Sequence, residues 1–150
     1  MEIMIKKERI KHNIDELIEK LKDRLIEEEE IVFAYILGSY GRNYIGPLSD
    51  FDIGIYIEEN KEIFEKKIYL NFIITDILKT DEVDIIILNT VSPFFLHHSL
   101  KNAKLLFSKD ERKRIFFLVK NLKEYFDMVY YYERFKESLL KRIREGKYGM

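Results

Sequence analysis

Three short, almost wholly apolar runs rich in β-branched residues constrain the fold of this chain more than any other feature. They span residues 31–37, 52–57 and 83–88. Apolar runs of this length that end at Gly, Asn or Pro are typical of buried strands. Because segments with helical spacing separate and follow them, the sequence predicts an α/β (α+β) fold, in which helices flank a small mixed sheet.

The remaining segments predict helices and one further strand. Apolar residues recur every three or four positions over residues 7–28, and residues 61–78 form a second predicted helix. After Pro93 we expect a short helix over 94–100, and then a brief edge strand over 104–107. A long C-terminal helix is predicted over 110–145.

Composition narrows the class of protein. The 150 residues carry a net charge of −1, are 47% hydrophobic and include no Cys. The hydrophobic fraction excludes intrinsic disorder, and the absence of Cys excludes disulfides and thiolate metal sites. The near-zero charge argues against a strong nucleic-acid footprint. No run approaches the roughly 20 apolar residues that span a bilayer, so we expect no membrane partner and a cytoplasmic protein. No linker or repeat divides the chain, which predicts a single domain over residues 1–150.

Two carboxylates stand at the entry to the second predicted strand. Asp50 and Asp52 are separated by one residue, so the two-residue period of a strand places both on one face. Neighbouring carboxylates in an apolar run repel each other and are costly to bury. A divalent cation removes that cost, and hard oxygen ligands favour Mg²⁺. The pair therefore predicts a magnesium site.

Asp84 is a third carboxylate, at the start of the otherwise apolar strand over 83–88. If this strand lies beside the strand of Asp52, three carboxylates converge at one end of the sheet. Three carboxylates that hold two metal ions can activate an attacking hydroxyl and stabilise the charge of a transferring phosphoryl group.

The segment between the first two strands supplies an anion site. Gly38 ends the first strand, and Gly38 and Gly41 allow backbone N–H groups to approach an anion closely. The Ser39 hydroxyl adds a donor, and Arg42 is placed to contact phosphate oxygens. A Gly-Ser turn alone is commonly only a turn, and an Asp-x-Asp alone is commonly a solvated loop. Joined at this spacing and followed by Asp84, they form a specific pattern.

This pattern resembles a known family. Gly38-Ser39, ten residues, Asp50-Phe51-Asp52 and then Asp84 look like the nucleotidyltransferase superfamily with the DNA polymerase β type fold. Within it, the chain is most similar to the minimal nucleotidyltransferases (MNT), which are the antitoxin partners of HEPN-domain toxins. The resemblance implies that Gly38 and Ser39 bind the triphosphate of ATP, and that Asp50, Asp52 and Asp84 coordinate Mg²⁺. It also implies transfer of AMP to a tyrosine of the toxin.

Three functions remain open from the sequence. The first is an adenylyltransferase antitoxin, the second a nucleotidyltransferase that modifies a small molecule, and the third a non-catalytic antitoxin that acts by occlusion. Beyond residue 88 the chain is mostly one predicted helix, so we expect the acceptor to bring much of its own binding surface. A protein acceptor meets that expectation best, and the three carboxylates favour catalysis.

The last predicted helix carries more aromatic surface than a core stripe needs. Part of it is expected to pack on the sheet, and the excess predicts an interface with a partner or a site of self-association. The apolar and aromatic residues are Phe116, Phe117, Leu118, Leu122, Tyr125, Phe126, Val129, Tyr130 and Tyr132. His97 and His98 lack an acidic partner at metal-ligand spacing, so no functional role is predicted for them.

Overall fold

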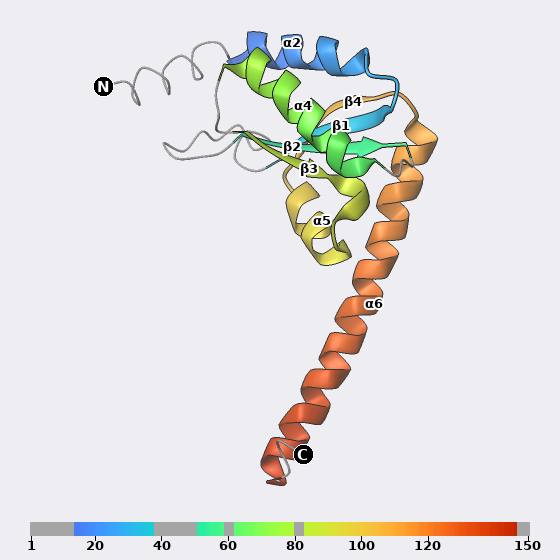
Figure 1. The fold of residues 1–150 in the computed structure, drawn as a ribbon. Helices are drawn as coiled ribbons and strands as arrows, with labels where there is room; N and C mark the ends of the chain where they lie inside the picture. Colours follow the sequence, from blue (N-terminus) through green and yellow to red (C-terminus); the bar gives the residue numbers. More distant parts are fainter. Residues whose placement is uncertain (1–13, 38–50, 59–61, 80–82, 147–150) are drawn as a thin grey trace, which may run out of the picture.

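The computed structural model describes residues 14–37, 51–58, 62–79 and 83–146. Figure 1 shows a compact layered body from which one long helix projects. In chain order the elements are α2 (Ile14–Ile26), β1 (Ile31–Leu37), β2 (Phe51–Ile57), α4 (Ile63–Leu78), β3 (Val83–Ile87), the 3₁₀ turn η1 (Leu88–Thr90), α5 (Pro93–Leu100), β4 (Lys104–Ser108) and α6 (Glu111–Arg144).

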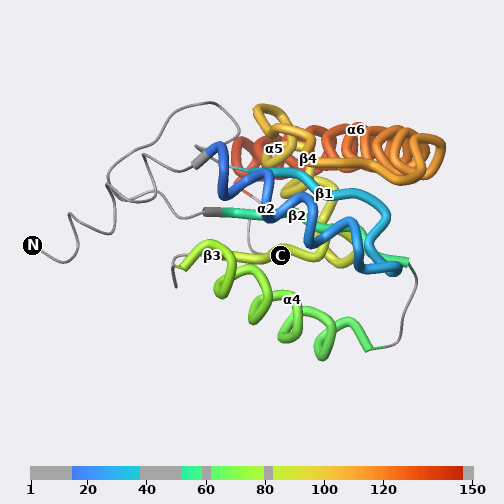
Figure 2. Tube along the Cα trace, turned by 90° about the horizontal axis from the view of Figure 1, so that it is seen from above, coloured from blue at the N-terminus to red at the C-terminus, as the bar shows by residue number. Residues whose placement is uncertain are grey.

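The four strands form one sheet in the order β3-β2-β1-β4. β1 is antiparallel to both β2 and β4, whereas β2 and β3 are parallel. A parallel pair needs a crossover connection, and α4 lies between β2 and β3 in the chain. Seen from above, α4 lies on the β3 side and α6 on the opposite side (Figure 2). The predicted small mixed sheet, flanking helices and edge strand are confirmed.

Each face of the sheet supports a separate hydrophobic cluster. α2 and α4 cover one face, and α5 with the first turns of α6 covers the other (Figure 1). Strand alternation explains this division, because successive side chains point to opposite faces. The first cluster includes Leu21, Leu25, Ile53, Ile55, Ile57, Leu70, Ile74, Ile85 and Ile87. The second includes Phe33, Tyr35, Leu37, Leu88 and Leu96, with Tyr56, Ile86 and Phe117 packed against it.

Several element boundaries differ from those predicted by the sequence. α2 ends at Ile26 rather than at residue 28, because the next residues form a turn in which the Glu28 N–H donates to Leu25 O at 3.1 Å. α5 begins at Pro93, whose missing N–H is not needed in the first turn, and the Ser92 hydroxyl caps it by accepting from Phe95 N–H at 3.2 Å. The predicted start of the first helix lies outside the described residues.

The third strand ends at Ile87, one residue before the predicted end, since residues 88–90 form η1. Asn89 holds this turn against β2. Its Oδ1 accepts from Ile57 N–H at 3.0 Å, and its Nδ2 donates to Ile57 O at 2.7 Å. This paired side-chain contact fixes the far end of the two parallel strands.

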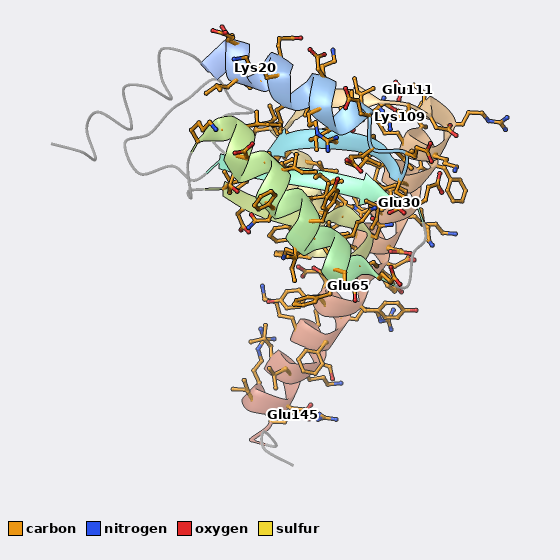
Figure 3. The ribbon with its side chains drawn as sticks, turned by 45° about the horizontal axis from the view of Figure 1, so that its top comes forward. Lys20, Glu30, Glu65, Lys109, Glu111 and Glu145 are labelled. Carbon is orange, nitrogen blue, oxygen red and sulfur yellow. The ribbon has the colours of Figure 1, made fainter. Side chains whose placement is uncertain are left out.

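The long C-terminal helix is confirmed, and only its first turns pack on the sheet. Asp110 caps α6 by accepting from Lys113 N–H at 3.1 Å. Phe117 packs against the rings of Phe33 and Tyr56, with centroids 5.7 and 4.8 Å away. Beyond Val129 every described residue of α6 is exposed. Figure 3 shows Glu145 at the far end of this helix, well away from the sheet.

Arg114 ties α6 to the sheet. Its Nη1 donates to the hydroxyl of the buried Tyr35 at 2.8 Å, and its other guanidinium nitrogens bind the carboxylate of Glu111. The hydrogen bonds to Glu111 and Tyr35 hold the pKa of Arg114 above its usual range. The guanidinium is therefore charged at any pH at which the protein is folded.

We expect Arg114→Met to lower the free energy of unfolding by about 1–3 kcal/mol, because it leaves the Tyr35 hydroxyl without its charged donor. Met keeps most of the apolar stem, so packing changes little. Urea unfolding followed by circular dichroism measures the effect. Arg112→Met, at an exposed position on the same turn, is the control and should stay within about 0.5 kcal/mol of the parent. Equal urea midpoints for Arg114→Met and Arg112→Met would contradict the role of Arg114 in anchoring α6 to the sheet.

Among the described residues, no helix combines the length and the apolar character needed to cross a membrane.

Candidate active site

The ends of three neighbouring strands bring two of the predicted site residues together. Leu37, the last residue of β1, pairs with Asp52 of β2, and Asp52 pairs with Asp84 of β3. Adjacent strands lie about 4.8 Å apart, so the Asp52 and Asp84 backbones are immediate neighbours. The convergence that the sequence predicted for these two carboxylates is therefore observed.

The two carboxylates lie on the same face of the sheet. Asp52 alternates with the buried Ile53, and Asp84 alternates with the buried Ile85, both of which point toward α2 and α4. Asp52 and Asp84 therefore share the face that α5 and α6 cover. Asp52 is half-buried and Asp84 is exposed. A ligand can thus reach the pair from solvent, while the core lies directly behind it.

Gly54 keeps the neighbouring part of this face flat. It lies two residues beyond Asp52 on the same face, between the side chains of Leu37 and Leu88. A Cβ at this position would be 2.9 Å from Leu88 Cδ2 and 3.2 Å from Leu37 Cδ1. The glycine therefore allows Leu37 to pack over β2, which positions the strand end from which the chain continues to Gly38.

An open groove runs along the outer edge of β3 and includes Asp84. Its volume is about 310 Å³. The lining side chains outside β3 come from both sides of the edge: Lys67 from α4, and Thr90, Val91, Ser92 and Phe95 from η1, α5 and the turn between them. In the described part of the chain no strand pairs with this edge of β3. The groove gives a second molecule a route to Asp84.

A larger cavity, of about 540 Å³, lies between β2, α5 and α6. Tyr56, Leu96, Phe117, Lys120 and Glu124 are among its lining residues. Tyr56 is near the end of β2 opposite to Asp52, so this cavity is separate from the carboxylate pair. We assign the chemistry to the pair, because apolar and amide side chains dominate the larger cavity.

The other predicted site residues, Gly38, Ser39, Arg42 and Asp50, lie outside the described residues. Within the described ranges no group of three His, Cys, Asp or Glu side chains could hold a metal ion. The donors that the structure does place together, the carboxylates of Asp52 and Asp84, fit Mg²⁺. It prefers oxygen ligands and commonly takes only one or two protein carboxylates.

Sequence reasoning missed two features of this region. Lys67 lies on α4, where it reads as an ordinary surface residue, and only the packing of α4 beside β3 brings it to the groove with Asp84. Asn89 bridges to β2, and its only sequence signal is an amide directly after an apolar strand.

The two histidines contact neighbouring parts of α5 and α6. The His97 ring stacks on Tyr125 of α6 at 3.8 Å between centroids. His98 Nδ1 donates to the Phe94 carbonyl oxygen at 2.9 Å. Both contacts join or stabilise α5 and α6.

The chain sequence matches the family described as "Polymerase beta, Nucleotidyltransferase" over residues 19–112. This match covers more than half of the chain and includes every predicted site residue. The chain belongs to the polymerase β nucleotidyltransferase family. No curated protein sequence matches this nucleotidyltransferase significantly.

Solved structures share the fold of this nucleotidyltransferase. One, described as a toxin–antitoxin with AMP-PNP, has a TM-score of 0.64 at 20% identity, over 83% of this chain and 97% of that chain. Another, of tri-AMPylated Shewanella oneidensis HEPN toxin in complex with MNT antitoxin, has a TM-score of 0.59 at 17% identity, over 82% and 98%. A third, the toxin–antitoxin MntA–HepT, has a TM-score of 0.58 at 16% identity, over 81% and 98%. At these identities the similarity establishes a common polymerase β-like fold.

Proposed function

We propose that this nucleotidyltransferase transfers AMP from ATP to a hydroxyl group of a cognate HEPN-domain toxin, and thereby acts as its antitoxin. The observation that carries the proposal is the alignment of Asp52 with Asp84, beside the strand that leads to Gly38 and Ser39. Membership of the polymerase β family supports nucleotidyl transfer. The fold shared with chains of toxin–antitoxin complexes, one with AMP-PNP and one with a tri-AMPylated toxin, supports the substrate and the partner.

Each predicted residue has a role in this reaction. Gly38 and Ser39 bind the triphosphate of ATP, and Arg42 contacts its phosphate oxygens. Asp50, Asp52 and Asp84 would hold Mg²⁺, as two ions. When bound, Mg²⁺ supplies charge stabilisation at the phosphoryl group and lowers the pKa of an attacking hydroxyl. We propose the cytoplasm, where ATP is available, as the site of the reaction.

The chemical step is an in-line displacement at the α-phosphorus. A bond forms between the acceptor oxygen and the α-phosphorus, while the bond to the β-phosphate bridging oxygen breaks and diphosphate leaves. The hydroxyl proton goes to Asp84. Of the two site carboxylates that the structure describes, Asp84 is the one that lines the open groove along β3, where an incoming acceptor can reach it.

The open groove also favours a macromolecular acceptor. As the described residues form it, the groove is open and lies on an exposed sheet edge, whereas small-molecule sites bury most of the ligand surface. A protein can instead bring a tyrosine hydroxyl to Asp84 from its own folded surface. We propose tyrosine as the acceptor residue.

Intact-mass spectrometry tests this proposal. The purified chain is incubated with ATP, Mg²⁺ and the HEPN protein encoded by the adjacent gene. We expect the toxin to gain mass in steps of one AMP, and its activity to fall as it does so. Asp84→Asn should form the complex without adding mass. If the parent chain neutralises the toxin without any mass gain, antitoxin action is by occlusion and the adenylyltransferase proposal is wrong.

A further inference from the structure

The projecting half of α6, residues 126–144, lacks support from the rest of the described chain. All its side chains except that of Val129 are exposed. Nevertheless it carries large apolar side chains, and Tyr132 and Phe135 are 62% and 66% exposed. Most of the stability of a helix in a protein comes from the packing of its apolar face, and this segment has no such packing within the described chain. The family match ends at residue 112, so this segment lies outside the region that defines the nucleotidyltransferase chemistry.

The apolar side chains of the projecting half continue the stripe that binds α6 to the body. Residues 114, 118, 121 and 125 face the sheet and α5 and are half-buried. From Tyr125 onward, alternating spacings of four and three residues lead to Val129, Tyr132, Lys136, Leu139 and Ile143. Met128 and Phe135 flank it. This alternation is the pattern of a coiled-coil seam, with one lysine among apolar residues.

We propose that the projecting half of α6 pairs with the same segment of a second copy of this chain, as an antiparallel two-helix coiled coil. The exposed seam is large enough for such a dimer. From the exposed fractions of its residues, the seam with its flanking residues offers at most about 1,100 Å² to two copies together, which is close to the roughly 1,000 Å² expected of a biological interface.

Lys136 selects the antiparallel arrangement. In a parallel pair each seam residue lies opposite its own counterpart, so the two Lys136 ammonium groups would meet inside the seam. In an antiparallel pair centred near residue 134, Lys136 lies opposite Tyr132 of the second copy, whose ring attracts a cation. Val129 then lies opposite Leu139 of the second copy, so apolar residues meet on either side.

Glu133 adds charge complementarity to the same arrangement. It lies one helical turn before Lys136, next to the seam. Around the two-fold axis of the antiparallel pair, each Glu133 therefore lies close to Lys136 of both copies, and the four charges alternate in sign. In this cluster the Glu133 carboxylates neutralise the charge of Lys136, which is the only charged residue of the seam.

Sedimentation equilibrium of the full chain tests the association. We expect a reversible dimer at micromolar concentrations and a monomer for Phe135→Lys, which removes the large apolar side chain that flanks the seam and adds like charge next to Lys136. Tyr130→Lys, the same kind of change on the opposite face of the helix, is the matched control and should remain dimeric. A parent chain that is monomeric at all concentrations, or a Phe135→Lys variant as dimeric as the control, overturns the proposal.

Disulfide trapping tests the orientation, and the chain offers a clean background because it has no Cys. Under mild oxidation, Val129→Cys and Leu139→Cys should each remain uncrosslinked alone and should crosslink to each other when mixed. Efficient crosslinking of Val129→Cys with itself would indicate a parallel pair and overturn the antiparallel arrangement. If the exposed face of α6 becomes buried only after the cognate toxin is added, the toxin and not a second copy of this chain covers this face, and the proposal is wrong. None of these measurements depends on nucleotidyl transfer.

Discussion

Replacing both Asp52 and Asp84 with Asn is expected to reduce nucleotidyl transfer about 10³-fold or more, while the chain stays folded. Loss of a single stabilising group at a developing charge commonly costs 10²–10³-fold, and this change removes two of the carboxylates proposed to hold Mg²⁺. Asn has nearly the same shape as Asp, so packing around β2 and β3 is conserved. Removing two neighbouring negative charges also relieves their repulsion in the metal-free protein.

Transfer rates and unfolding curves measured on the same preparations separate a loss of nucleotidyl transfer from a loss of stability. Thermal unfolding without Mg²⁺ should show a midpoint equal to or above that of the parent chain. Asp127→Asn is the matched control, since Asp127 is an exposed carboxylate on α6, outside the proposed site. Its transfer rate should equal that of the parent. Transfer at the parental rate by the double variant would refute the assignment of these carboxylates.

Gly54→Val is expected to lower the free energy of unfolding by about 2–3 kcal/mol, and Gly54→Ala by less, since overpacking costs grow with the added volume. Even the first added carbon would come within 2.9 Å of Leu88 and 3.2 Å of Leu37. Each contact involves a methyl group of a flexible leucine, so Ala can be accommodated by a small shift. Val adds two more methyl groups to a space that both leucines fill.

Urea unfolding of Gly54→Val, Gly54→Ala and the parent chain measures the order of their free energies of unfolding. A second effect should accompany it. Because Leu37 immediately precedes Gly38, displacing it should weaken ATP binding as well, which equilibrium titration with ATP detects. Gly146→Ala, at an exposed position beyond α6, is the control for a general glycine effect; its positive φ of 70° makes a small loss of stability expected, without any change in ATP binding. A Gly54→Val variant as stable as the parent would show that this face of β2 is not tightly packed.

The sequence predicted the elements of the fold and the convergence of two carboxylates. β-branched runs predicted strands over 31–37, 52–57 and 83–88, each within one residue of the observed bounds, because a buried strand needs that composition whatever its neighbours are. Asp52 and Asp84 were identifiable because each interrupts such a run. A carboxylate within an apolar run is costly to bury without a partner, so two of them at neighbouring strand ends indicate a ligand site. The family resemblance was confirmed by the match over residues 19–112.

Properties that depend on packing between distant segments could not be predicted in this way. The order β3-β2-β1-β4 and the antiparallel pairing of β1 with β2 depend on how the connecting segments pack. Lys67 reaches the groove of Asp84 only because α4 lies against β3. In α6 the aromatic excess was visible in the sequence, but the position at which the helix leaves the body depends on its packing against α5, where His97 stacks on Tyr125.

The most direct test of the central claim uses ATP labelled at the α-phosphate and, in parallel, ATP labelled at the γ-phosphate. Each is incubated with Mg²⁺, the chain and its cognate HEPN protein. We expect label from the α-phosphate to become covalently attached to the HEPN protein, label from the γ-phosphate to be released as diphosphate, and Asp84→Asn to abolish the attachment. Attachment of the γ-phosphate label would indicate phosphoryl transfer in place of nucleotidyl transfer. Attachment of neither label, with the toxin neutralised, would contradict a catalytic role.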